Sequence, residues 1–339
     1  MKPIHLLAAG AWCCVCAVGA IAQINVETVV VGNPGNAGEK SGKGAGGMGE
    51  DRVCGAVKYT YEMGKFEITA EQYTEFLNAV AATDTCGLYN PQMTSHAEGC
   101  KIERTGSAGS YKYTVAEEWA KRPVNFVSWA DAARFANWLH NGQPTGPQDK
   151  TTTENGSYAL NGAKDDAALL ALKRRRKATW VIPTEDEWYK AAFHRNDGVT
   201  GHYWDYATSS NTLPGSKLIS PDPGNSANFD PDGQGKDVTV GPPYFRTPVG
   251  AFKNSPSPYG TFDQGGNVWE WIEAIHRQQG QVRRGVRGAS YTTLSQHMQA
   301  ADRHFALEPL TEHHLVGFRL ARVEPRRPAP TSRRSESPH

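Results

Sequence analysis

One short segment late in the chain, GGNVWEW at residues 265–271, places oxygen-bearing side chains beside glycine. Asn267 and Glu270 offer an amide and a carboxylate oxygen three positions apart, and the glycines allow neighbouring backbone carbonyls to converge. Ca²⁺ binds about six to eight oxygen ligands of these kinds. The segment is therefore a candidate calcium site, with its two tryptophans packed as an apolar wall. The alternative is that Glu270 hydrogen-bonds the loop backbone or an arginine such as Arg319.

A second segment, ANFDPDG at residues 227–233, carries a similar set of oxygens. Asn228, Asp230 and Asp232 stand in the N-x-D-x-D-G order that opens an EF-hand calcium loop. The position that closes such a loop holds Thr239 in place of glutamate, and no helical pattern flanks the segment. The pattern argues against an EF-hand and leaves two interpretations open, a looser calcium cage and an ordinary Asp/Gly surface turn.

Other reactive residue types point to no further chemistry. The adjacent His313 and His314 project in different directions, so the C-terminal histidines lack the helical H-E-x-x-H spacing of a zinc site. The run KRRRK at residues 173–177 has no interleaved aromatic residues, and we expect it to be a solvated insertion. A formal net charge of +1 also argues against nucleic acid as the main partner.

The elements that would position these residues are a few helices among short strands. Three helices are predicted by capping boxes at Thr69, Ser128 and Thr184, each followed by apolar residues on one face. Short β-like segments bounded by Gly, Pro, Asn and Asp lie at residues 59–68, 179–182, 282–287 and 316–323. This mixture predicts an α+β fold that is rich in loops.

The two ends of the chain differ from its middle in composition. Lys2, an apolar run at residues 6–18 and Ala-Ile-Ala at 20–22 predict a signal peptide at 1–22, cleaved after Ala22. This run is too short to span a bilayer, so we expect a secreted or periplasmic protein without stable membrane insertion. We expect a Gly-rich leader at residues 23–54, one domain at 55–323, and a disordered basic tail at 324–339.

Three of the six cysteines lie within the predicted signal peptide, so the mature chain keeps Cys54, Cys86 and Cys100. In an oxidising compartment Cys86 and Cys100 could close a short surface loop and leave Cys54 free. The sequence leaves open whether they are joined. No cysteine follows Cys100.

Four separated segments carry a family resemblance. They are GKFEITAEQYTEFLNAV (64–80), RPVNFVSWADAARFANWLHNG (122–142), VIPTEDEWYKAA (181–192), and the stretch from GNVWEW through RGASY (287–291) to GFRLA (317–321). In this order and spacing the chain resembles the formylglycine-generating enzyme family, also called the sulfatase-modifying factor domain. The resemblance covers residues 55–323. It implies a single asymmetric, C-type-lectin-like α+β domain with few helices, short strands and bound structural calcium.

The resemblance also implies a chemistry from which this sequence departs. In the prototype enzymes a cysteine pair binds copper(I), and molecular oxygen converts a cysteine of a sulfatase peptide to formylglycine. Here Met298, Gln299 and Arg303 stand in the neighbourhood of the expected thiols. Because Cu(I) requires soft thiolate ligands, copper is not expected as a cofactor. The calcium sites are carried over to Asn267, Val268 (by its carbonyl) and Glu270, and to the cluster of the second segment.

These observations predict a secreted, calcium-stabilised module that binds an exported protein, a peptide or a glycan. The residues expected to face the ligand lie between RGASY and GFRLA or at its edge: Ser290, Met298, Gln299, Arg303 and His304. For Ser290 the alternative is a hydrogen bond to the backbone. A divergent formylglycine-generating enzyme acting on exported proteins is the alternative function, so enzymatic activity stays open. Oxygen consumption with a Cys-x-Pro-x-Arg peptide would discriminate the two.

Overall fold

A computed structural model describes residues 23–278, 280–303 and 305–325 of the chain. The predicted signal peptide at 1–22, the predicted ligand residue His304 and residues 326–339 of the predicted tail lie outside this range. Among the described residues, no helix is both long enough and apolar enough to cross a bilayer.

The three helices expected from the sequence are confirmed. They are α1 (Ala70–Val80), α4 (Trp129–His140) and α6 (Glu185–Phe193), and each begins with a complete capping box. In each box the Ser or Thr side chain accepts the backbone N–H three residues on, and that residue's side chain accepts the N-cap N–H. Shorter helical turns complete the set: α2 (Gln92–Ser95), α3 (Glu117–Ala120), α5 (Asp166–Ala171), η1 (Lys43–Ala45) and η2 (Ser295–Met298).

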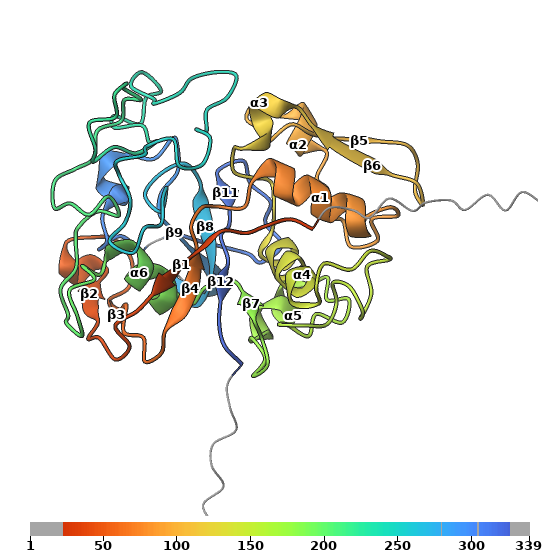
Figure 1. The fold of residues 1–339 in the computed structure, drawn as a ribbon, viewed down its shortest axis with the longest axis horizontal. Coiled ribbons are helices and arrows are strands. Elements are labelled where there is room, and N and C mark those ends of the chain that lie inside the picture. Colours follow the sequence, from red (N-terminus) through yellow and green to blue (C-terminus); the bar gives the residue numbers. More distant parts are fainter. Residues whose placement is uncertain (1–22, 279, 304, 326–339) are drawn as a thin grey trace, which may run out of the picture.

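One antiparallel sheet joins the two ends of the described chain (Figure 1). Its strands, in spatial order, are β1 (Thr28–Val31), β4 (Tyr61–Gly64), β12 (Ala321–Arg322) and β7 (Trp180–Val181). The register aligns Val30 with Glu62, Glu62 with Arg322, and Arg322 with Trp180. Because residues directly opposite each other share a face, these four side chains form one row across the sheet.

A second four-stranded sheet carries the GNVWEW segment. Its spatial order is β10 (Ala306–Leu307), β9 (Gln281–Arg287), β8 (Trp269–Gln278) and β11 (Val316–Gly317). The β8–β9 hairpin is interrupted by a bulge between Trp271 and Ile275, and β11 runs parallel to β8. Two separate hairpins, β2 (Glu39–Ser41) with β3 (Arg52–Cys54) and β5 (Ile102–Thr105) with β6 (Lys112–Val115), lie outside the sheets.

The structure differs from the sequence expectation in two places. The single strand expected at residues 316–323 is divided into β11 and β12, which belong to different sheets. Residues 28–54, within the expected Gly-rich leader, form β1, β2 and β3, and Val31 is fully buried. Gly-rich composition therefore marks tight turns here, because η1 and the β2–β3 hairpin contain glycines with positive φ such as Gly42 and Gly46.

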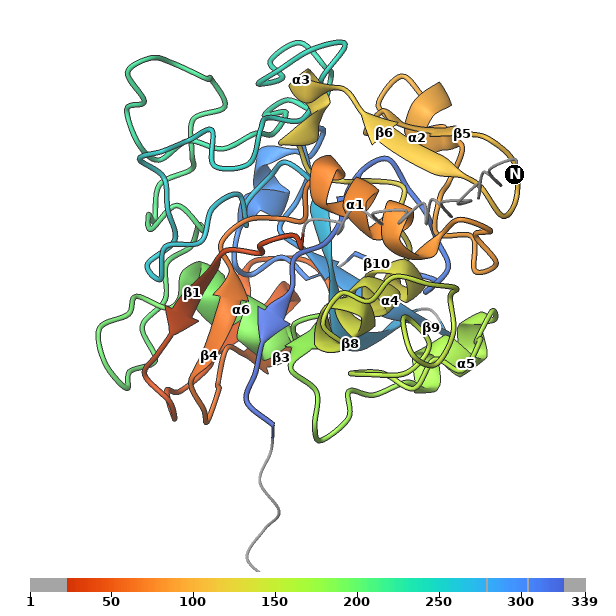
Figure 2. The same cartoon turned by 45° about the vertical axis from the view of Figure 1, so that its right-hand side comes forward.

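The core is an aromatic cluster between α1 and α4. Tyr73 of α1 stacks on Phe135 of α4 with ring centroids 6.0 Å apart, and Phe318 packs edge-on against Phe135 at 5.4 Å. Phe318 therefore holds the β11–β12 segment against the helices. Residues 194–268, all of which the structure describes, form no helix or strand beyond isolated bridges. They run as long loops at one side of the molecule, opposite the α1–α3 and β5–β6 group (Figures 1 and 2).

Candidate functional site

The fold brings the two candidate calcium segments together. The backbone N–H of Asn267 donates to the carbonyl of Asn228 at 2.8 Å, and the Asn228 amide donates to Oδ1 of Asn267 at 3.0 Å. A Cβ at Gly266 would lie 2.3 Å from the Asn228 carbonyl oxygen, so only glycine permits this approach. Oδ1 of Asn267 also accepts from the Thr247 backbone N–H at 3.1 Å. The Asn267 side chain is thus used to join loops.

Glu270 forms an ion pair with Arg319 at the centre of the molecule, and both side chains are fully buried. Arg319 donates from Nε to Oε2 at 2.6 Å and from Nη2 to Oε1 at 2.7 Å. Trp188 Nε1 donates to Oε2 at 2.7 Å. This carboxylate has its charge balanced and three donors satisfied, which is the arginine contact that the sequence left open. The charge of the Glu270 carboxylate is therefore balanced by groups of the protein itself.

Two further carboxyl groups lie near the Glu270–Arg319 pair. Glu67 is buried, and neither of its side-chain oxygens has a hydrogen-bond partner. Burial, followed by the neighbouring Asp263, raises the pKa of Glu67 well above its ordinary value. Burial likewise raises the pKa of Asp263 to about 6, although Arg319 acts in the opposite direction. Two further carboxyl groups with raised pKa values thus lie beside Arg319, in addition to its main partner Glu270.

The ANFDPDG segment retains unsatisfied oxygens that suit a hard cation. Oδ1 of Asn228 and Oδ1 of Asp230 are buried without a hydrogen-bond partner. Burial raises the pKa of Asp230, and the adjacent Asp232 raises it further. Amide and carboxylate oxygens are the ligands that Ca²⁺ prefers, so this donor set fits calcium. Across residues 23–278, 280–303 and 305–325, no three His, Cys, Asp or Glu residues are grouped to hold a metal. A cation here would therefore depend on amide and backbone oxygens as well.

The residues expected to face a ligand are mostly buried. Ser290 is fully buried and shares a hydrogen bond of 2.8 Å with the Thr293 hydroxyl. Met298 is 3% exposed, and Arg303 is 6% exposed. Gln299 is half-buried and donates from Nε2 to the Tyr206 hydroxyl at 3.3 Å. The structure does not gather these side chains on one open surface, and their polar groups attach the 290–303 loop to the scaffold.

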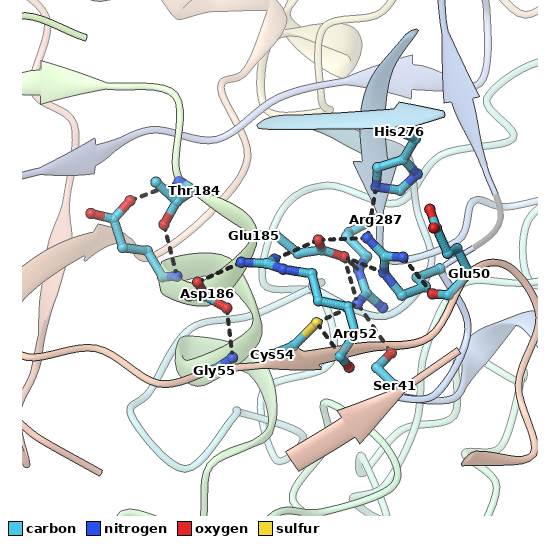
Figure 3. Close-up of polar contacts among 12 residues, drawn as sticks. Ser41, Glu50, Arg52, Cys54, Gly55, Thr184, Glu185, Asp186, His276 and Arg287 are labelled. Carbon is cyan, nitrogen blue, oxygen red and sulfur yellow. Dashed lines mark hydrogen bonds and ion pairs between the residues drawn. The ribbon is translucent and has the colours of Figure 1, made fainter. Parts of the chain in front are cut away.

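Arg303 belongs to a buried charge cluster that the sequence analysis missed (Figure 3). Glu185, the first residue of α6, accepts from Arg52 at 2.6 Å, from Arg287 at 2.9 Å and from Arg303 at 3.0 Å. Figure 3 shows the Glu185 carboxylate between Arg52 and Arg287, with Asp186 on the other side of Arg52. Although burial acts to raise it, the pKa of Glu185 is strongly lowered, with Arg287 as the largest lowering cause. The only sequence signal was the run of acidic residues after the capping threonine.

The three cysteines of the described chain are separate free thiols. Burial raises the pKa of Cys54 to about 11, even though Arg287 approaches its sulfur at 3.6 Å. Burial also raises the pKa of Cys86 and of Cys100. The disulfide that the sequence left open between Cys86 and Cys100 is not formed in this structure. All three side chains therefore favour the thiol over the thiolate.

Two cavities flank the segment formed by Lys58 and Tyr59. The sheet-face cavity, of about 810 Å³, is lined by strands β1, β4 and β12 and by residues 174–176. A second cavity, of about 530 Å³, is lined by Arg52, the first residues of α6 and Arg303. The basic run at 173–177, expected to be a solvated insertion, thus forms one wall of a cavity. Its place beside the sheet depends on long-range packing that the local sequence pattern does not report.

Comparisons with known proteins agree with this fold. The family model described as "Sulfatase-modifying factor enzyme 1-like domain" matches residues 23–324. A curated relative from Mus musculus, "Inactive C-alpha-formylglycine-generating enzyme 2", is 28% identical over 167 residues, which are 49% of this chain and 46% of the relative. The chain thus spans about half the length of that relative.

Solved structures extend the likeness to most of the chain. The crystal structure of CarF has a TM-score of 0.52 at 19% identity, and the match covers 88% of this chain and 99% of CarF. The variable protein 1 of Treponema denticola has a TM-score of 0.49 at 18% identity over 87% of this chain and 94% of its own. PvdO from Pseudomonas aeruginosa has a TM-score of 0.48 at 17% identity over 87% and 93%. The predicted fold, a single loop-rich α+β domain, is confirmed.

Proposed function

Because the chain belongs to the family of sulfatase-modifying factor enzyme 1-like domains, we propose that it uses the family scaffold to bind a ligand or protein and does not carry out the copper-dependent oxidation. One observation carries this proposal. The 290–303 loop contains no cysteine, and the three thiols of the described chain are unpaired and buried or half-buried, with raised pKa values. Copper(I) requires soft thiolate ligands, and no pair of them is available in the described chain.

One cysteine packs beside the 290–303 loop, and its properties support the same conclusion. Cys54 shares an apolar cluster with Ala300 of the loop, so one thiol does lie beside it. Burial favours the protonated thiol of Cys54, and one thiol does not supply the pair of thiolates that the copper(I) site of the family uses. A thioether such as that of Met298 is a weak copper ligand and does not replace two thiolates. The mouse relative is named an inactive enzyme, which is consistent with loss of the reaction in some members of this family.

Calcium is proposed as a structural ion of the Asn228, Asp230 and Asp232 cluster. The two buried oxygens without partners support this choice. An ion there would neutralise Asp230 and Asp232 and fix the 227–237 loop against GNVWEW, to which Asn228 is already hydrogen-bonded. No step of a reaction is assigned to it.

Export is proposed from the N-terminal sequence, whose basic, apolar and small-residue regions follow the order of a signal peptide. Mass spectrometry of the protein recovered outside the cytoplasm would then give a chain that begins at Gln23. Recovery of a full-length chain, retained in the cytoplasm, would contradict this part of the proposal.

The main proposal is tested by oxygen consumption. The mature protein, checked for folding by circular dichroism, is incubated with a Cys-x-Pro-x-Arg peptide and oxygen, with and without copper(I). The expected rate equals that of the buffer with copper alone. Copper-dependent turnover that scales with protein concentration and yields the aldehyde product by mass spectrometry would overturn the proposal.

A further inference from the structure

We propose that the sheet-face cavity is a binding site for an acidic peptide segment that carries an apolar side chain. This inference rests on the proposed binding function and names the place and the class of ligand. The cavity volume of about 810 Å³ falls within the range of sites that enclose small ligands, roughly 300–1,000 Å³. It therefore suits a few residues of a peptide rather than a folded surface.

The floor of the cavity is formed by strands β1, β4 and β12 of the first sheet. Val30 lies in the middle of β1 and lines the cavity, yet it is 64% exposed. Tyr59, at the edge, is 37% exposed. A single exposed aliphatic side chain is common on protein surfaces, so Val30 supports the proposal through its place beside the cations of the same cavity. The floor thus offers a contact for one apolar side chain of a ligand.

The wall of the cavity is cationic. Its basic lining residues are Lys58, Arg174, Arg175, Arg176 and Arg322, against the acidic residues Glu62 and Glu324. Arg174 is neutralised from outside the cavity by Glu187 at 2.8 Å and Glu273 at 2.9 Å. Lys58, Arg175 and Arg322 alone still outnumber the two acidic residues, so the cavity has a surplus of positive charge that favours an anionic ligand.

The positions of the cations favour carboxylate recognition at the rim. Arg175 and Lys58 are exposed, and the Arg175 guanidinium has a neutral partner, the Asn155 side chain. Arg322 lies over the Trp180 ring at 5.8 Å, while the Glu62 carboxylate with which it pairs is 3.7 Å away. A guanidinium in such a setting can bind a second carboxylate through two parallel hydrogen bonds.

The combination of floor and rim selects among anionic ligands. A sulfated oligosaccharide would satisfy the cations but has no aliphatic group to cover Val30. A nucleic acid would require a longer basic surface with aromatic platforms on which bases stack. A peptide with carboxylates on both sides of a leucine or valine matches both parts of the cavity, so the geometry points to this class.

The test uses the mature protein in calcium-containing buffer and a short fluorescein-labelled peptide in which glutamates flank one leucine. Fluorescence anisotropy should show saturable binding that weakens as salt is raised. The double variant Lys58→Glu and Arg175→Glu should bind about tenfold more weakly or worse, since two attractive charges become repulsive. Lys112→Glu, an exposed lysine on β6 remote from the cavity lining, should bind as the wild type does.

A second pair of variants tests the apolar floor. Val30→Ser should weaken binding several-fold, whereas Val53→Ser, at 62% exposure on another short strand, should leave it unchanged. No binding of the peptide, or equal loss in the Lys112 or Val53 controls, would overturn the inference. The inference would also be overturned, in favour of a glycan, if a heparin-derived oligosaccharide bound more tightly than the peptide and its affinity were unchanged by Val30→Ser. Each of these outcomes leaves the proposed loss of oxidase activity standing, because that is judged by oxygen consumption alone.

Discussion

Replacement of Glu270 by glutamine tests whether this residue balances an arginine or holds calcium. The substitution keeps the volume of the side chain but removes its charge, and it leaves Arg319 with a neutral partner in a fully buried site. In the wild type the Arg319 guanidinium donates to both carboxylate oxygens of Glu270. The introduced glutamine can still accept from Trp188 with its one oxygen, but its amide N–H groups then face a guanidinium donor. If the role of Glu270 is to form this ion pair, the loss of stability in the variant does not depend on calcium.

The magnitude follows from the geometry of the pair. Breaking a buried ion pair by removing one partner costs about 3–5 kcal/mol, because the remaining charge stays buried. Here Glu67 and Asp263 lie close enough to Arg319 to act on its pKa, and both have raised pKa values. Glu67, whose pKa lies well above its ordinary value, can ionise to replace part of the lost charge. We therefore expect a loss of about 3 kcal/mol, roughly 6 °C in Tm at ~2 °C per kcal/mol.

The neighbouring Asp263 carboxyl makes the loss of stability depend on pH. The folded-state pKa of Asp263, about 6, lies above its ordinary value of 3.8, so the wild type loses stability as pH rises through this window. Burial is the largest cause of the raised pKa and Glu270 is a smaller one, so removal of Glu270 lowers the pKa of Asp263 only in part. The variant then loses less stability over the same window. The difference in stability between wild type and variant should therefore become smaller from pH 5 to pH 8.

Thermal unfolding followed by circular dichroism, in excess calcium and in excess chelator, measures both effects. The Glu270→Gln loss should be equal in the two buffers, and Glu71→Gln, which breaks an exposed pair with Lys121, should cost less than about 1 kcal/mol. The double variant Glu270→Leu and Arg319→Met, which removes both charges, should be more stable than Glu270→Gln. A loss of stability seen only in calcium would refute the ion-pair reasoning and would indicate that Glu270 is a calcium ligand.

Three further changes test other parts of the molecule. Glu185→Gln should lower the free energy of unfolding in urea by about 3–5 kcal/mol, because three guanidinium groups lose the carboxylate that they share. Asp186→Asn should lower it by less than half as much, because its partner Arg52 is partly exposed. Burial raises the pKa of Glu312 to about 8, so the stability of the wild type should fall as pH rises from 4.5 to 8. In unfolding experiments from pH 5 to 9, Glu312→Gln should make the free energy of unfolding less dependent on pH. Asp230→Asn should lower Tm in calcium but not in chelator, as followed by scanning calorimetry; an equal change in both buffers would remove the cation from this cluster.

The helices could be predicted because their signals are local. The hydroxyls of Thr69, Ser128 and Thr184 accept the N3 backbone N–H at 3.2, 3.1 and 3.1 Å. Every atom of each box lies within four consecutive residues, so the sequence contains the whole interaction. The family segments extended this to the order of the elements and to a single domain. They did not show that residues 316–323 are shared between two sheets, because that depends on strands elsewhere in the chain.

The site could not be predicted to the same degree because its partners are remote in the sequence. Glu270 offers the same oxygens to calcium and to arginine, and Arg319, 49 residues away, decides between them. Glu185 meets Arg52, Arg287 and Arg303 across 133, 102 and 118 residues. The acidic run at the start of α6 was visible, but a helix dipole and solvent satisfy such a run equally well. Only the packed fold selects the three arginines.

The burial of the 290–303 loop connects the missing thiols with the place proposed for binding. A loop that presents reactive sulfur to a substrate must leave its side chains accessible, yet Met298 is 3% exposed and Ser290 is fully buried. Arg287 fixes the loop backbone through the Ala300 and Asp302 carbonyls, and Arg303 anchors its end to Glu185. Several of these side chains are therefore engaged in anchoring the loop, although Arg303 also lines the second cavity. The sheet-face cavity offers more exposed groups to a ligand, with Val30 on its floor and a surplus of cations on its wall.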